Sequence, residues 1–157
     1  MRLVGVLLLI LASSAGQRLP SGALPCDVTV PNGIVAGSDK TVAGSYGNAQ
    51  LSVGPFGLWP NGTVVFKWPG PGFFLPDGSL SMKFGWTRGV QGRLTVDGRR
   101  LDAAAPPLRA DVPDGYGDTG FQATALIFPT PGCWEVSGHV GNARLAFVTR
   151  VVKIEDP

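Results

Sequence analysis

The chain has 157 residues, a length that suits one ordinary domain with a sizeable hydrophobic core. Only 15% of the residues are charged, the formal net charge is +2, and no block of like charges occurs. Nucleic-acid-binding domains carry clustered Lys and Arg, so we expect no nucleic-acid partner. The 23 glycines and 14 prolines alternate with apolar, β-branched and aromatic runs, a pattern typical of short strands joined by turns.

The N-terminus has the pattern of a secretory signal. Residues 1–15 begin Met-Arg, continue with an apolar run over residues 3–12 and end in Ser13-Ser14-Ala15. A membrane-spanning helix needs about 20 apolar residues, and neither this run nor any later one is that long. We therefore expect a signal peptide over residues 1–15, a secreted or periplasmic mature protein, and no transmembrane span in the mature chain.

The two cysteines, Cys26 and Cys133, are interpreted in the light of this export signal. Outside the cytosol a pair of thiols forms a disulfide more often than a metal or redox site. The sequence therefore predicts a bond between the start of the domain and a strand near its end. The alternative is a lipoprotein anchored at Cys26, which Pro25 disfavours because a small residue should precede a lipid-modified cysteine.

Residues 16–25 are expected to be a flexible lead-in, and residues 26–157 a single domain. A first short strand is predicted over residues 26–30, followed by a long loop over residues 32–50. Asn61-Gly62 between apolar runs predicts a hairpin that leads into a strand over residues 63–67. Residues 80–86 alternate apolar with small or polar side chains, which predicts a strand with one buried face.

A second hairpin is predicted around Asp97-Gly98, and three closing strands follow. These strands are expected over residues 121–128, 133–140 and 144–154. No segment has a convincing helical period. The sequence therefore predicts an all-β fold, an antiparallel immunoglobulin-like β-sandwich of about eight or nine strands.

The end of the chain carries the most distinctive residues. Phe128-Pro-Thr-Pro-Gly-Cys-Trp-Glu-Val-Ser-Gly138, followed by the strand-like residues 141–152, resembles the last two strands of small exported bacterial proteins of unknown function. Residues 59–66 and 114–121 share the likeness, which covers roughly residues 58–152. The resemblance implies an immunoglobulin-like fold and a bacterial source, and it brings no activity with it.

Catalytic motifs are missing from the sequence. His139 is the only histidine, and neither Gly-x-Ser-x-Gly nor a P-loop or dinucleotide fingerprint occurs. We expect the protein not to be an enzyme. A hydrolase would need carboxylates such as Asp111, Asp114, Asp118 or Glu135 to meet in one cleft.

The acidic segment Asp111-Val-Pro-Asp114-Gly-Tyr-Gly-Asp118 is a candidate calcium site. It offers three carboxylates, and Ca²⁺ takes about six to eight oxygen ligands. The spacing is not that of an EF-hand, and Asp, Gly and Pro are also the ordinary residues of turns. We therefore favour a turn and expect no cofactor, with structural calcium as the alternative.

Three aromatic residues, Trp68, Phe73 and Phe74, lie in a Pro- and Gly-rich segment and form a candidate ligand-binding patch. Exposed loop aromatics stack on sugar rings or fill a partner's pocket, whereas aromatics in small β-domains are more often core. The leading expectation is an exported non-catalytic module with a binding or structural role in the cell envelope, its partner an unidentified protein or glycan. The alternative is a carbohydrate-binding module, which requires these rings to be exposed.

Overall fold

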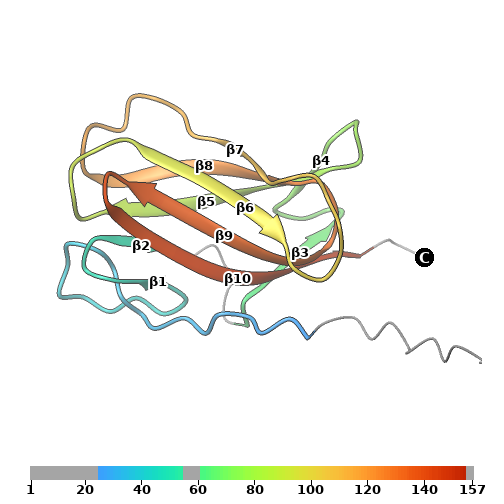
Figure 1. The fold of residues 1–157 in the computed structure, drawn as a ribbon, viewed down its shortest axis with the longest axis horizontal. Coiled ribbons are helices and arrows are strands. Elements are labelled where there is room, and N and C mark those ends of the chain that lie inside the picture. Colours follow the sequence, from blue (N-terminus) through green and yellow to red (C-terminus); the bar gives the residue numbers. More distant parts are fainter. Residues whose placement is uncertain (1–24, 55–60, 155–157) are drawn as a thin grey trace, which may run out of the picture.

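A computed structural model describes residues 25–54 and 61–154. Within these two ranges the chain forms ten strands and no helix, arranged as two layers (Figure 1). The predicted all-β class is confirmed. With no helix in the described part, none there has the length and apolarity needed to cross a membrane.

One layer is a six-stranded antiparallel sheet. Its strand order is β1-β2-β5-β8-β7, and β4 pairs with the first residues of β5 on the side where β2 pairs with the last ones. The long central pair, β5 and β8, runs from Leu80 opposite Phe128 to Arg88 opposite Gly120. The bounds are β1 (Tyr46–Gly47), β2 (Leu51–Val53), β4 (Phe73–Phe74), β5 (Leu80–Arg88), β7 (Arg109–Asp111) and β8 (Gly120–Phe128).

The other layer is a four-stranded sheet in the order β3-β10-β9-β6. Its strands β9 and β10 form a tight hairpin, and β10 also pairs with β3 in parallel. This parallel pair is an exception to the antiparallel pattern expected from the sequence. The bounds are β3 (Thr63–Lys67), β6 (Leu94–Arg100), β9 (Gly132–Val140) and β10 (Ala143–Ile154).

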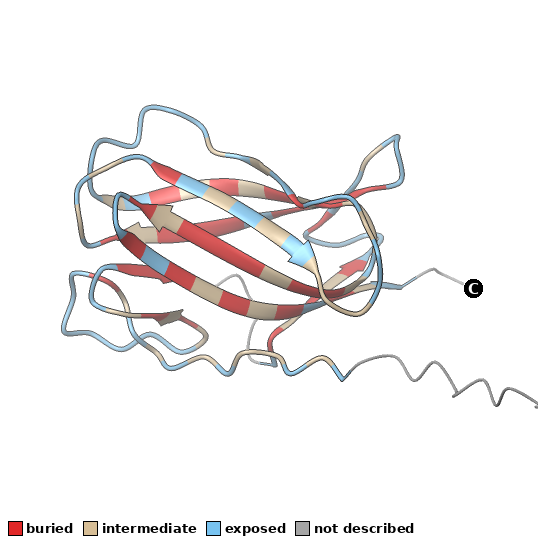
Figure 2. Ribbon diagram, viewed as in Figure 1, coloured by how far each residue is buried: buried red, intermediate tan, exposed pale blue. Residues whose placement is uncertain are grey.

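The hydrophobic core lies between the two sheets, and buried residues alternate with less buried ones along β8 and β10 (Figure 2). The strand predicted over residues 80–86 is present, and Leu80, Met82, Phe84 and Trp86 are all buried as expected. The other face is not fully exposed as the alternation implied, because Ser81 and Gly85 are buried as well. Trp86 contacts β9 of the opposite sheet so closely that a Cβ on Gly138 would lie 2.4 Å from its ring. The two sheets therefore approach each other through a large ring on one and a bare backbone on the other.

The hairpin predicted at Asp97-Gly98 is wrong. Both residues lie inside the continuous strand β6, where Asp97 pairs with Ser137 and Gly98 with Val136. Gly98 serves close packing instead of a turn: a Cβ there would lie 2.7 Å from the carbonyl oxygen of Glu135 and 3.2 Å from Leu108. The short strands β1, β2, β4 and β7 were not predicted. The apolar run before Asn61, which the sequence predicts to pair with residues 63–67 in a hairpin, lies outside the described residues.

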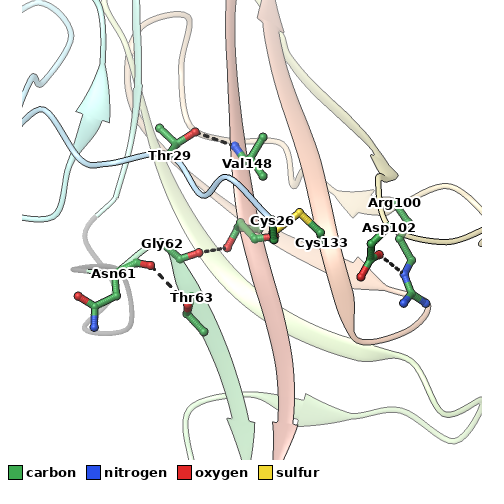
Figure 3. The surroundings of a disulfide bond; sticks show 10 residues. Cys26, Thr29, Asn61, Gly62, Thr63, Arg100, Asp102, Cys133 and Val148 are labelled. Carbon is green, nitrogen blue, oxygen red and sulfur yellow. Dashed lines mark hydrogen bonds and ion pairs between the residues drawn. A yellow bond between two sulfur atoms is a disulfide. The ribbon is translucent and has the colours of Figure 1, made fainter. Parts of the chain in front are cut away.

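The segment predicted as a first strand, residues 26–30, is not assigned as a strand. It lies beside β10 (Figure 1), where Thr29 donates its backbone N–H to the Val148 carbonyl and accepts the Val148 N–H at its hydroxyl. The predicted disulfide is present: Cys26 and Cys133 are bonded, with Cα atoms 5.5 Å apart (Figure 3). The bond fastens this segment to β9, and Thr29 fastens it to β10.

Candidate ligand-binding site

The three aromatic residues selected from the sequence are all exposed. Trp68 is 67% exposed, Phe73 56% and Phe74 38%, whereas Trp86 and Trp134 are fully buried. Trp68 follows β3 and precedes a Pro-Gly turn that leads into β4. This exposure is what the binding alternative requires, since rings of this size are usually core residues.

The three rings do not form one flat platform. Phe73 and Phe74 are consecutive in β4, so they point to opposite faces of the sheet. Phe74 is on the core side, where its ring meets Phe66 edge-on at 6.3 Å and lies 5.7 Å below the Lys153 ammonium. Phe73 is on the outer face.

The outer face carries a row of side chains that crosses the sheet at this level. Phe73 pairs with Ser81, Ser81 with Ile127, and Ile127 with Arg109. Directly opposed residues of neighbouring strands have Cβ atoms about 5 Å apart. The register therefore places an exposed ring and an exposed guanidinium on one side of the same sheet, separated by Ser81 and Ile127.

A pocket of about 430 Å³ opens at the Arg109 end of this row. Its polar lining consists of Asp77, Ser79, Arg109 and Thr130, and its apolar walls are Pro106, Pro107 and Pro129. Pockets of this size and mixed lining are typical of small-ligand sites.

The polar side chains of the pocket hold one another in place. Asp77 accepts hydrogen bonds from the Ser79 hydroxyl and from the Ser79 backbone N–H (3.0 Å). Arg109 Nη2 donates to Asp77 Oδ2 at 2.8 Å and to Ser79 Oγ at 3.0 Å. The Ser79 bonds, with the Arg109 charge, lower the pKa of Asp77 below its usual 3.8, against a smaller opposing effect of burial.

Thr130, at the other side of the pocket, is held by hydrogen bonds to both its side chain and its backbone. Its hydroxyl accepts a hydrogen bond from Arg100 Nη1 at 3.1 Å, and Arg100 Nε donates to Asp102 at 2.7 Å (Figure 3 shows the Arg100–Asp102 pair). The Thr130 carbonyl accepts the indole N–H of the buried Trp134. The pocket is thus built on a rigid frame of side chains.

The three carboxylates of the acidic segment are not grouped together. Among residues 25–54 and 61–154 no three His, Cys, Asp or Glu side chains gather in a group that could hold a metal ion. Asp111 lies in β7, and the exposed Asp114 pairs with Arg93 at 3.7 Å. The structure therefore lends no support to the calcium alternative.

The same loop is instead organised by a buried cation, Arg88. Its guanidinium donates to the carbonyl oxygens of Gly92 (2.8 Å), Tyr116 (3.0 Å) and Gly117 (2.9 Å), and more weakly to that of Thr119. A pocket of about 210 Å³ lies beside it, lined also by Asp114 and Asp118. Sequence reasoning missed Arg88, because its role depends on two loops that come together only in the fold.

The remaining titratable residues singled out in the sequence lie on the outer face of the four-stranded sheet. His139 contacts Asp97 at 3.1 Å, and Glu135 pairs with Arg99 at 3.0 Å. Glu135 on β9 and Asp111 on β7 belong to different sheets, whereas Asp114 and Asp118 line the same pocket beside Arg88. These contacts are those of ordinary cross-strand pairs.

No protein-family model, no curated protein and no solved structure matches this chain. The outer face offers an exposed phenyl ring, a fixed guanidinium with a carboxylate beside it, and proline walls. Such a set binds a ligand that has both apolar faces and polar edges.

Proposed function

We propose that the chain is an exported, non-catalytic module with an immunoglobulin-like β-sandwich, and that it binds a glycan of the bacterial cell envelope through its exposed aromatic residues. The observation that carries the proposal is the exposure of Trp68 and Phe73. Both faces of a sugar ring present C–H groups, which pack against an aromatic ring that water would otherwise cover.

The export part of the proposal is supported by the N-terminal signal pattern and by the Cys26–Cys133 disulfide, since such bonds persist outside the cytosol. The immunoglobulin-like part is supported by two β-layers around one core, and by the likeness to small exported bacterial proteins described above. The calcium and hydrolase alternatives are less favoured, because no three acidic side chains of the described residues gather in one group and Asp111 and Glu135 lie on different sheets.

The test is a fluorescence titration of the mature protein, residues 16–157, with a panel of purified glycans. We expect at least one glycan to change the tryptophan emission in a saturable manner. Trp68→Ala and Phe73→Ala should each weaken its binding about tenfold, which corresponds to about 1.4 kcal/mol.

Phe121→Ala is the matched control. Phe121 is 54% exposed, nearly the same as Phe73, but it pairs with Thr87, roughly 20 Å along β5 from the partner of Phe73. Its replacement should leave the affinity unchanged. A flat titration across the whole panel, or equal losses in Phe73→Ala and Phe121→Ala, would count against the proposal.

A further inference from the structure

We propose that the pocket formed by Asp77, Ser79, Arg109 and Thr130 is the polar half of the binding site, and that it takes a neutral sugar. In this site Phe73 contacts one sugar ring of an oligosaccharide, and Arg109 and Asp77 hydrogen-bond the hydroxyl groups of another. The inference rests on the proposed function and names the ligand class and the contacting residues.

The first step is the geometry of the outer face. The row from Phe73 through Ser81 and Ile127 to Arg109 is continuous, because each pair is set by strand register. Ser81 is buried beneath its neighbours, and Ile127 is half-buried, so the middle of the row is low and its two ends stand out. An extended ligand laid along this row reaches Phe73 and the pocket at once.

The second step is the hydrogen-bonding capacity of Arg109. Among the described residues only its Nη2 has acceptors, namely Asp77 and Ser79. The Nε–H and the two Nη1 hydrogens remain as three donors on a side chain that is 55% exposed. The guanidinium is already oriented by its carboxylate partner, so a ligand that uses these donors does not have to order the side chain itself.

The third step is the charge of the pocket. The Asp77 carboxylate lies 2.8 Å from the Arg109 guanidinium, so the two charges cancel locally. An anionic ligand that approached Arg109 would meet the Asp77 charge next to it. Hydroxyl groups both donate and accept hydrogen bonds, and therefore match a site that offers Arg109 donors next to Asp77 lone pairs.

The fourth step is the apolar lining. Pro106, Pro107 and Pro129 give the pocket rigid walls without N–H donors, and its volume of about 430 Å³ lies in the range of small-ligand sites. The proline faces cover the C–H groups of the sugar unit whose hydroxyl groups Arg109 and Asp77 contact, and the Phe73 ring covers the C–H face of another unit of the same oligosaccharide. Neutral saccharides combine both kinds of surface in one molecule.

The experiment is an amide NMR titration of the ¹⁵N-labelled mature protein with four neutral oligosaccharides, the hexamers of cellulose, xylan, mannan and chitin, and with hexagalacturonate as the anionic comparison. We expect at least one neutral hexamer to shift the amide signals of Phe73, Ser79, Arg109 and Thr130. Arg109→Gln and Ser79→Ala should both weaken this binding, the former at least tenfold.

Arg99→Gln is the matched control, because Arg99 is also exposed and paired with a carboxylate, Glu135, but lies on the outer face of the other sheet. It should change the affinity less than twofold. The dispersion of the amide signals shows whether each variant is folded. If Arg109→Gln does not fold, the loss of binding in Ser79→Ala tests the inference.

Two outcomes would overturn this inference but not the proposed function. One is a neutral hexamer that shifts the amide signals of Trp68 and Phe74 but not those of the pocket residues. The other is binding that neither Arg109→Gln nor Ser79→Ala weakens. Binding of hexagalacturonate alone would overturn the neutral-sugar assignment and leave the glycan-binding proposal standing. Binding of none of the five oligosaccharides would overturn the neutral-sugar inference, and a saturable response to another glycan in the fluorescence titration would still support the proposed function.

Discussion

Arg88 holds the loop between β7 and β8 in place through hydrogen bonds to its backbone carbonyl oxygens. Its side chain is 3% exposed, and its guanidinium is bonded to backbone carbonyl oxygens instead of a carboxylate. Its Nε has no partner among the described residues, so the burial of this cation is only partly compensated. Hydrogen bonds to charged groups contribute about 1.5–3 kcal/mol each before such costs.

Arg88→Met should therefore lower the free energy of unfolding by about 1–3 kcal/mol, because three carbonyl oxygens lose a charged donor while the side-chain volume is largely kept. Urea denaturation of the two proteins measures the difference. Arg93→Met is the control: its ion pair with Asp114 is exposed, and it should cost less than about 0.5 kcal/mol. Equal stability of Arg88→Met and the wild type would show that the loop is held by other contacts.

Asp102 gives a pH-dependent contribution to stability. The hydrogen bond from Arg100 is the main cause that lowers the pKa of Asp102 below its usual 3.8, against the opposing effect of burial. A carboxyl group with a lowered pKa in the folded state stabilises the protein above pH 3.8. That stability is lost as the pH falls through the folded-state value.

We therefore expect the stability difference between the wild type and Asp102→Asn to be largest above about pH 5 and to shrink as the pH falls below about 4. Urea unfolding at a series of pH values measures this. Arg100→Gln should flatten the profile in the same way, since it removes the cause of the shift. A wild-type curve that runs parallel to that of Asp102→Asn at all pH values would contradict the assignment.

At the scale of elements, β5 of one sheet packs tightly against β9 of the other where Trp86 meets Gly138. A Cβ on Gly138 would lie 2.4 Å and 2.8 Å from two atoms at the outer edge of the Trp86 indole. Trp86 is fully buried and its indole N–H donates to the Thr124 hydroxyl, so the ring has little room to move. The spacing of the two sheets at this point is set by a glycine.

Gly138→Ala should accordingly destabilise the protein by about 1–3 kcal/mol through overpacking. The same change in a Trp86→Phe background should cost clearly less, because phenylalanine lacks the atoms that the new methyl group would strike. A double-mutant cycle by urea denaturation measures this coupling. Additive losses would mean that the methyl group is accommodated without pressing on Trp86.

At the scale of the whole molecule, the disulfide joins the segment before β1 to the start of β9. Cys26 and Cys133 are 107 residues apart, so the bond closes the chain between them into one large loop, with β10 outside it. It also holds the N-terminal segment beside β10, where Thr29 bonds to Val148 (Figure 3). Loss of the bond would raise the conformational entropy of the unfolded chain and would remove the link between this segment and β9.

Replacement of both cysteines by serine should lower the free energy of unfolding by up to roughly 4–5 kcal/mol, the loop-closure value for a separation of this length. Urea denaturation of the wild type and of the double variant gives the number. Mass analysis after alkylation, with and without reduction, should show no free thiol in the unreduced protein. Two alkylated cysteines in unreduced, exported protein would be inconsistent with the bond.

Several features of the fold were predictable from local patterns. The alternation of Leu80, Met82, Phe84 and Trp86 predicted a half-buried strand because strand side chains alternate between faces, whatever the partner strand is. The disulfide was predictable from the signal-peptide pattern and the cysteine count, and the candidate aromatics from their Pro- and Gly-rich surroundings. Asp97-Gly98 was misinterpreted because turn preference is a local signal, whereas the role of Gly98 is contact with Glu135 and Leu108.

By itself, then, the sequence determined the all-β class, the longer strands and the pair of cysteines that join, all of which follow from short-range periodicity or composition. Only the tertiary structure decided that Phe73 and Phe74 point to opposite faces, and that Asp77, Ser79 and Arg109 meet at one pocket. Arg109 lies 32 residues from Asp77 in the chain, and β8 lies between β7 and β5 in the sheet. Their contact follows from strand order and register, which non-local pairing sets and no local pattern encodes.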